Sequence, residues 1–167
     1  LGKIDVAPSD PILTIDQALN AGTFVSEQRQ MGRGDWQTAL EDAPRNTKGT
    51  TWSGGQDHFY LEGHVALAVP QEDRDMLVYS SAQHPSEVQH GVAQVLGVPV
   101  NAVTVEIRRM GGAFGGKESQ ATIVAAIAAA LARVSGRPAK LRLSRDDDMT
   151  VTGKRHDFLF RYNVGFD

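Results

Sequence analysis

The sequence contains no cysteine and no long hydrophobic run. Without cysteine the chain cannot form a disulfide, a thiolate zinc site or a protein-held iron–sulfur cluster. No apolar stretch approaches the roughly 20 residues that cross a bilayer, so we expect no membrane partner. An excess of positive charge is also missing, because 17 basic and 20 acidic residues give a formal net charge of −3. This balance disfavours a nucleic-acid partner, which requires a basic face.

The length and composition are those of a globular protein. The chain has 167 residues, of which 41% are hydrophobic and 22% charged, enough for one core and too apolar for disorder. It starts at "LGKIDVAP" without an initiator methionine or a signal-peptide pattern. It ends at "FLFRYNVGFD", where the alternation typical of a strand still continues. We therefore expect a piece of a larger polypeptide.

The hydrophobic pattern predicts an α+β fold, with mixed sheets and two helices. Residues 1–50 are rich in turn formers and are interpreted as a connecting region or the end of a preceding domain, with a strand or short helix near 36–42. Residues 51–167 are interpreted as the N-terminal part of a second domain. Strands are predicted at 64–70, 75–81, 102–109, 139–144 and 159–164, the first two as a hairpin, and helices at 84–99 and about 118–135.

The second predicted helix carries a stripe of large apolar side chains. The stripe consists of Ile123, Ile127, Leu131 and Val134, at helical spacing. Most of the other positions are alanine, so we expect this helix to be buried nearly all round.

The stretch "RRMGGAFGGKESQ", residues 108–120, lies between the strand at 102–109 and that helix. A glycine loop before a helix favours a bound anion or oxo group, because the first helical N–H groups have no partner in their own helix. Gly111 to Lys117 matches a phosphate-binding P-loop, but Glu118 stands where that motif needs a hydroxyl for Mg²⁺. A nucleotide site is therefore disfavoured. The alternative is a simple tight turn, with Glu118 complementing the helix dipole.

A second stretch, "WSGGQDHFYLEGH" at residues 52–64, changes this balance. Together, "GGQDHFYLE" and "RRMGGAFGGKESQ" resemble the molybdenum-binding subunit or domain of the xanthine dehydrogenase/xanthine oxidase family. The resemblance continues through "SSAQHPSEVQHGVAQVLGV" and "SRDDDMTVTGKRHDF" and is looser over the first 50 residues. It implies part of a molybdopterin-binding domain from a molybdenum hydroxylase that oxidises purines, hypoxanthine or xanthine to urate, with water as the oxygen source.

The resemblance also implies roles for individual residues. Gln56 is expected to hydrogen-bond an oxo ligand of molybdenum without ligating the metal. Phe114 and Gly115 are expected to present backbone N–H groups to the molybdenum–molybdopterin cofactor. Glu118 is expected to bind the purine, since aldehyde oxidases of the family generally lack a carboxylate there. Ala113 departs from the usual third glycine and must therefore have a negative φ or tolerate a methyl group.

Other family features are expected outside this chain. The general-base glutamate and the substrate-binding arginine are expected beyond Asp167, so the chain holds no catalytic residue and should be inactive alone. Implied partners are the rest of the molybdenum domain and domains or subunits with 2Fe–2S clusters and FAD, with NAD or oxygen as acceptor, in a cytoplasmic enzyme. Two alternatives stay open: an aldehyde oxidase-type fragment, and a non-catalytic relative that acts as an interaction module.

The remaining candidate residues have simpler explanations. "RDDDM" (145–149) is predicted to be a solvated loop or helix cap, because three consecutive aspartates cannot all face one ion from a regular element. The histidines lack the spacing of a known metal motif. Arg108 and Arg109 could neutralise a cofactor phosphate or point into solvent. Trp52, Phe59 and Tyr60 are most simply core or interface residues.

Overall fold

A computed structural model of the protein describes residues 5–167, which form two compact units. One unit contains the described residues up to Gly55 together with His156–Asp167, and the other is Gln56–Arg155. Within this chain the change of unit falls at Gly55 and again at Arg155. The predicted division into domains near residue 50 concerns a longer protein and stays a prediction.

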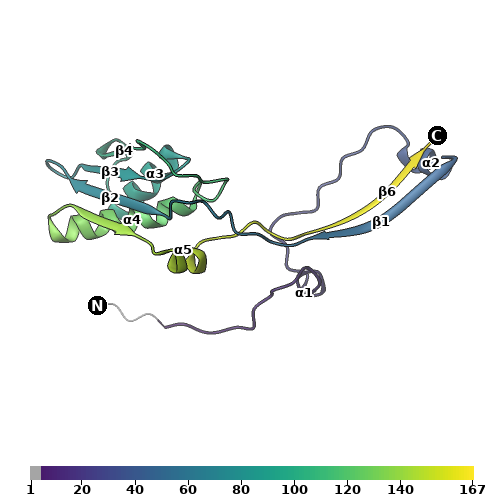
Figure 1. Ribbon diagram of the computed structural model, residues 1–167, viewed down its shortest axis with the longest axis horizontal. Helices are drawn as coiled ribbons and strands as arrows, with labels where there is room; N and C mark the ends of the chain where they lie inside the picture. The colour runs from purple at the N-terminus through teal and green to yellow at the C-terminus, as the bar shows by residue number, and fades with distance from the viewer. Residues whose placement is uncertain (1–4) are drawn as a thin grey trace. The chain divides into compact units, whose positions relative to one another are not determined.

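The first unit is built on a long two-stranded ribbon (Figure 1). Strand β1 (Arg45–Ser53) pairs antiparallel with β6 (Phe158–Phe166) over nine residue pairs, from Arg45↔Phe166 to Ser53↔Phe158. The unit also holds two short helices, α1 (Ile15–Ala21) and α2 (Trp36–Glu41). The short helix predicted near residues 36–42 is therefore confirmed.

The second unit contains a four-stranded sheet in the order β4-β3-β2-β5. Strands β2 (Val65–Pro70) and β3 (Met76–Ser80) form the predicted hairpin, and β5 (Ala139–Arg142) pairs antiparallel with β2. Strand β4 (Val103–Glu106) runs parallel to β3 and follows it through helix α3 (Pro85–Leu96) and the 3₁₀ turn η1 (Val100–Ala102). With helix α4 (Gln120–Ser135), these mixed strands and helices confirm the α+β class.

The core lies between one face of this sheet and helices α3 and α4. Ala66 and Ala68 of β2, Met76 and Val78 of β3, and Val88 of α3 belong to one buried cluster with the alanines of α4. Alanine lets a helix approach a sheet closely because no long side chain keeps the backbones apart. The core of this unit is therefore held by small residues and by tight contact between α4 and β2.

The expectation that α4 is buried nearly all round is wrong. Its alanine face packs in the core, whereas the stripe of larger residues is exposed, from 46% at Ile127 to 87% at Val134. The pattern located the stripe correctly but could not tell which apolar face meets the sheet. The steric reason is again the size of alanine.

The segment "RDDDM" begins helix α5 (Arg145–Val151). Ser144 accepts a hydrogen bond from the Asp147 amide, 3.1 Å, and so caps the helix N-terminus. The prediction of a solvated loop or helix cap for residues 145–149 is therefore wrong: these residues form the helix itself, its cap is Ser144, and Asp148 is buried. None of the helices among residues 5–167 has both the length and the apolar character needed to cross a membrane.

Candidate functional site

The two glycine-containing motifs lie against each other. The Glu62 amide donates to the Gly111 carbonyl, 3.1 Å, and the Gly111 amide donates to the Glu62 carboxylate, 3.0 Å. A β-carbon at Gly116 would lie 2.6 Å from the Tyr60 ring and 2.8 Å from the His58 ring. Only glycine permits so close an approach. The loop at residues 111–116 is thus packed along residues 58–62, although Glu62 and Gly111 are 49 positions apart in the sequence.

Lys117 is the inner anchor of this loop. Its side chain is completely buried, and its ammonium donates to Ser81 Oγ at 2.8 Å and to Glu62 Oε2 at 3.0 Å. The ammonium also lies 4.8 Å from the centre of the Tyr60 ring, a cation–π distance. A buried charge is tolerable only when it is paired and hydrogen-bonded, and Lys117 meets both conditions.

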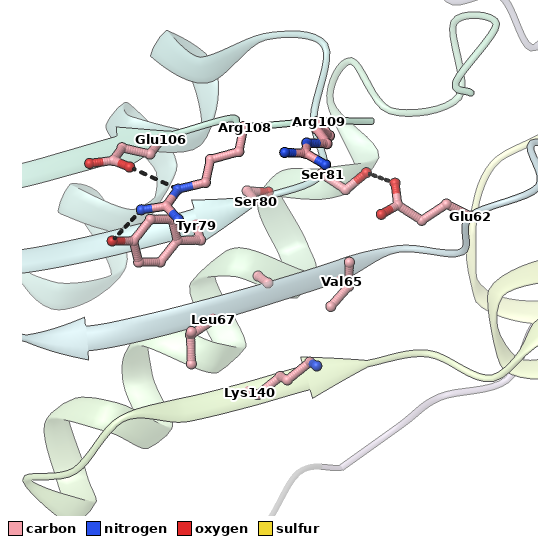
Figure 2. Close-up of a pocket in the computed structure, with 11 residues that line it drawn as sticks. Glu62, Val65, Leu67, Tyr79, Ser80, Ser81, Glu106, Arg108, Arg109 and Lys140 are labelled. Carbon is pink, nitrogen blue, oxygen red and sulfur yellow. Dashed lines mark hydrogen bonds and ion pairs between the residues drawn. The ribbon is translucent and has the colours of Figure 1, made fainter. Parts of the chain in front are cut away.

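Glu62 completes this buried cluster. Burial opposes ionisation of its carboxyl, but hydrogen bonds from Ser81 and Gly111 and the nearby Lys117 ammonium outweigh burial and lower the pKa of Glu62. Figure 2 shows the contact between Ser81 and Glu62 at one end of the sheet. The carboxylate therefore stays ionised at neutral pH and ties β3 to the start of the glycine loop.

Gln83 fixes the other half of the loop. Its side-chain oxygen accepts hydrogen bonds from the amides of Gly115, 3.0 Å, and Lys117, 3.2 Å. The backbone N–H group of Gln83 donates to the Lys117 backbone carbonyl, 2.9 Å. Three hydrogen bonds thus join one residue before α3 to the second half of the loop. Sequence reasoning missed Gln83, Glu62 and Lys117 as organisers of the loop, because their pairing depends on contacts between distant segments.

The outer side of the loop carries three of the predicted site residues. Phe114 has a positive φ of 55° and is 73% exposed, and within residues 5–167 its amide hydrogen has no acceptor. Gly115, at φ 90°, also has little around it, since a β-carbon there would meet only His58, at 4.0 Å. The Gly115 amide, however, is already bonded to Gln83. Glu118 is exposed at the end of the loop.

Ala113 was expected to have a negative φ or space for its methyl group, and the structure agrees. It is absent from the residues with positive φ and is 4% exposed. Its methyl group is therefore accommodated without backbone strain. Helix α4 begins at Gln120, so Phe114 and Gly115 lie in the turns before the helix rather than at its first residues.

Gln56 is held by its backbone and leaves its side chain free. Its amide and carbonyl exchange hydrogen bonds with Arg155, 3.2 and 2.9 Å. The side chain is exposed and forms no hydrogen bond to any described residue. Next to it, the hydrogen bond from the Phe59 amide and the pairing with Lys154, 3.2 Å, lower the pKa of Asp57 against the opposing effect of burial. The start of this unit is thus rigidly tied while one amide side chain points outward.

A second buried polar cluster joins the segment at residues 60–64 to helix α5. The Tyr60 hydroxyl donates to Asp148 Oδ1, 2.6 Å, and the His64 amide donates to Asp148 Oδ2, 2.6 Å. Burial raises the pKa of Asp148, but these bonds and the His64 ring outweigh it, and the net pKa is lowered. Burial and the Asp148 carboxylate together raise the pKa of the Tyr60 hydroxyl well above its ordinary range. Tyr60 is core, as predicted, whereas Phe59 and Trp52 are mostly exposed.

The remaining candidates do not form a metal site. Within the part of the chain that the structure describes, no three His, Asp or Glu side chains gather as metal ligands. Arg108 lies over the Tyr79 ring, 4.8 Å from its centre, and pairs with Glu106 at 3.5 Å (Figure 2). Arg108 therefore belongs to the sheet surface, and a role toward a phosphate stays a prediction for Arg109.

The glycine loop and Gln56 suit a ligand that accepts hydrogen bonds. The chain has no cysteine, so no thiolate of this chain can bind such a ligand. Residues 20–167 match the family model of the molybdopterin cofactor-binding domain. The chain belongs to this molybdopterin cofactor-binding domain family.

Relatives of known activity are similar over nearly the whole chain. Xanthine dehydrogenase/oxidase of Gallus gallus is 42% identical over 165 residues, which is 98% of this chain and 12% of that protein. Nicotinate hydroxylase of Emericella nidulans is 44% identical over 161 residues, 93% of this chain and 12% of that protein. The chain thus spans about an eighth of the length of these relatives.

Solved structures show the same fold. Aldehyde oxidoreductase from Desulfovibrio gigas superposes with a TM-score of 0.71 at 24% sequence identity, over 79% of this chain and 14% of that one. At this identity the similarity concerns the fold alone. It agrees with the expected α+β fold.

The residues present fit a molybdopterin cofactor. The unpaired Phe114 amide, the open backbone at Gly115 and the free Gln56 side chain are polar, exposed and fixed by the contacts described above. The N–H group of Gly115 is bonded to Gln83, so Gly115 offers open backbone surface here. Its expected hydrogen bond to the cofactor stays a prediction.

Proposed function

We propose that this chain is the segment of a larger molybdenum hydroxylase that holds one side of the cofactor and one side of a purine substrate. The observation that carries the proposal is the contrast at the end of the glycine loop. The Lys117 side chain is anchored inside, whereas the next residue, Glu118, is exposed, as are Phe114 and Gly115 of the same loop. The proposed reaction is oxidation of hypoxanthine or xanthine to urate in cytoplasmic purine catabolism, with water as the oxygen source.

In this proposal each residue has a limited task. The Gln56 amide donates a hydrogen bond to an oxygen on the metal side of the cofactor, and the Phe114 N–H donates to the cofactor at the loop. The Glu118 carboxylate accepts a hydrogen bond from a ring N–H of the purine, which orients the carbon to be oxidised. When bound, the cofactor supplies the redox centre that takes two electrons from the substrate. Iron–sulfur and FAD domains elsewhere would pass them to NAD or oxygen.

Nicotinate is a second candidate substrate. Nicotinate hydroxylase is as similar to this chain as the xanthine dehydrogenases are. Nicotinate is a nitrogen heterocycle without a ring N–H in its neutral pyridine form, so Glu118 would have no hydrogen bond to accept from it. Glu118 therefore favours the purine over nicotinate and over simple aldehydes.

The test uses the full-length protein and four substrates: hypoxanthine, xanthine, nicotinate and benzaldehyde. We expect purine oxidation in the native protein, and Glu118→Gln should lower kcat/KM for xanthine roughly 5- to 10-fold, because the amide oxygen still accepts the hydrogen bond but carries no charge. Glu72→Gln, an exposed glutamate in the β2–β3 turn, is the control and should leave kcat/KM unchanged. Turnover of nicotinate or benzaldehyde without purine turnover would contradict the proposal. The isolated chain should be inactive.

A further inference from the structure

The two faces of the four-stranded sheet differ sharply in burial. Along β2, Ala66 and Ala68 are 1% and 0% exposed and face the helices. The alternating residues Val65 and Leu67 are only half-buried, and they point to the opposite face. Helices α3 and α4 share a single core with the first set of residues, so neither covers the second. We call this second side the open sheet face.

A broad cavity of about 600 Å³ lies over the open sheet face. Val65, Leu67 and the ring of Tyr79 form its apolar floor, from neighbouring strands β2 and β3. Charged side chains stand around this floor (Figure 2): Glu62, Glu106, Arg108, Arg109 and Lys140. An apolar floor with a charged rim is the composition of a protein–protein contact surface.

The charges on this rim do not balance. Glu62 is already paired with the buried Lys117, 3.0 Å, and Glu106 is paired with Arg108, 3.5 Å. Among the described residues, Arg109 and Lys140 have no ion-pair partner. Two positive charges are therefore left over, one beside β4 and one on β5, with the apolar floor between them.

We propose that the open sheet face docks a segment of the full-length protein in which acidic residues flank apolar side chains. The apolar side chains cover Val65, Leu67 and Tyr79, while carboxylates pair with Arg109 and Lys140. A segment of the same protein is the expected occupant because this chain spans only 12% of the length of its relatives. A polynucleotide fits poorly, since two free cations over an apolar floor neutralise few phosphates.

This inference goes beyond the proposed catalytic role and rests on the chain being part of a larger enzyme. The test is zero-length carbodiimide coupling of the purified full-length protein, followed by mass spectrometry of the peptides. A carbodiimide joins an amine to a carboxylate only where the two are in contact, and Lys140 supplies the amine. We expect Lys140 to be linked to an Asp or Glu outside residues 1–167.

Amine labelling of the same protein measures how far Lys140 is covered. Labelling of Lys140 should be at least 10-fold slower in the native protein than in urea-unfolded protein, and Lys117, which is buried within its own unit, is the reference for a protected lysine. Lys140→Arg should leave hydrogen exchange of the linked acidic segment unchanged, whereas Arg109→Glu with Lys140→Glu should repel that segment and speed its exchange.

Each other outcome overturns the proposal. Native labelling of Lys140 at the unfolded rate would show a face open to solvent. Protection of Lys140 without a link to an acidic residue would mean a non-acidic occupant. A link that joins two differently isotope-labelled copies would assign the face to self-association. Molybdenum content of the same sample separates failure of this inference from failure of the proposed function, because the cofactor loop and the open sheet face are measured independently.

Discussion

Lys117 and Glu118 are neighbours in the sequence and have opposite environments. The Lys117 side chain is 0% exposed and has three partners inside the protein, whereas Glu118 is exposed and has no hydrogen bond to any described residue. The same contrast runs through the glycine loop, where Gly116 is buried against the Tyr60 and His58 rings and Phe114 is exposed. One side of the loop is used for folding, and the other is the side proposed to bind the cofactor.

The comparison explains how a glycine-rich loop can still be well defined. Glycine has the largest conformational freedom of any residue, so a loop of this composition is costly to order. The buried Lys117–Glu62 pair and the three hydrogen bonds of Gln83 offset that cost from the inner side. Exposed polar groups on the outer side are then held in place without contributing to stability themselves.

The largest expected effect comes from the inner side. Lys117→Met keeps the length and apolar stem of the side chain but leaves Glu62 and Ser81 without their partner. Removing one member of a buried pair costs about 3 kcal/mol of unfolding free energy here, the lower end of the usual range, because Glu62 is 37% exposed and can be partly hydrated. Urea denaturation followed by circular dichroism measures it, since both tryptophans lie in the other unit and would not report on this one.

Lys140→Met is the matched control for that experiment. Lys140 is also a lysine of the same unit, but it is exposed on a strand. In residues 1–167 alone, where the proposed docked segment is absent, its substitution should change the unfolding free energy by less than about 0.5 kcal/mol. Equal destabilisation by the two variants would mean that burial of Lys117 does not organise this unit.

The next effect concerns the outer side and should appear in catalysis alone. Glu118→Gln should leave the unfolding free energy within about 0.5 kcal/mol of the original protein, because the side chain is exposed and unpaired. The cost should appear instead as about 1–1.5 kcal/mol of lost transition-state stabilisation for xanthine in the full-length protein, because the amide oxygen accepts the hydrogen bond without the charge. Loss of stability together with activity would remove the distinction between the two sides.

Gln83 gives a smaller effect with a diagnostic pattern. Gln83→Ala removes the acceptor of the Gly115 and Lys117 amides and should cost about 1 kcal/mol, with faster hydrogen exchange at both amides. Gln83→Glu should preserve both bonds, since a carboxylate still accepts. Gln89 is the opposite case: its side-chain nitrogen donates to the Val103 carbonyl, 2.7 Å, so Gln89→Glu should be destabilising. A harmful Gln83→Glu would contradict the assignment of Gln83 as an acceptor.

The smallest effect is the dependence of stability on acid. Glu62 and Asp148 have lowered pKa values in the folded protein, below their ordinary values of 4.5 and 3.8. The unfolded chain therefore binds protons first as the pH falls, so the stability from these groups is present above about pH 4.5 and is lost below it. Urea midpoints measured between pH 7 and pH 3 should show this decline. In Glu62→Gln the decline should be shallower, and an unchanged slope would exclude Glu62 as a contributor.

Local signals in the sequence were enough to predict most of the second unit. Pro85 and Gly97 mark the bounds of α3, and Gly136 marks the end of α4 in a left-handed conformation. The β2–β3 hairpin follows from two apolar runs with a charged turn between them. These features depend on neighbours in the chain, so the sequence pattern predicts them well.

Features that depend on distant contacts were not predictable. Strand β1 is polar along its first half and pairs with β6 more than 100 residues later, so no local alternation marks it. The inward face of α4 could not be chosen because both of its faces are apolar. The Lys117–Glu62 pair likewise joins two motifs separated in sequence. From the sequence alone, Lys117 matched the lysine of a phosphate-binding loop.

The most direct test of the central claim, that the outer side of the glycine loop holds a molybdopterin cofactor, is elemental mass spectrometry of the full-length protein. It should be purified from cells shown to make the cofactor, with pterin measured in the same sample. The account predicts near-stoichiometric molybdenum and pterin, both reduced in Gln56→Ala and retained in Glu118→Ala. A protein free of metal and pterin from such cells would contradict the claim, and Gln56, Phe114 and Glu118 would then be surface residues of a non-catalytic relative.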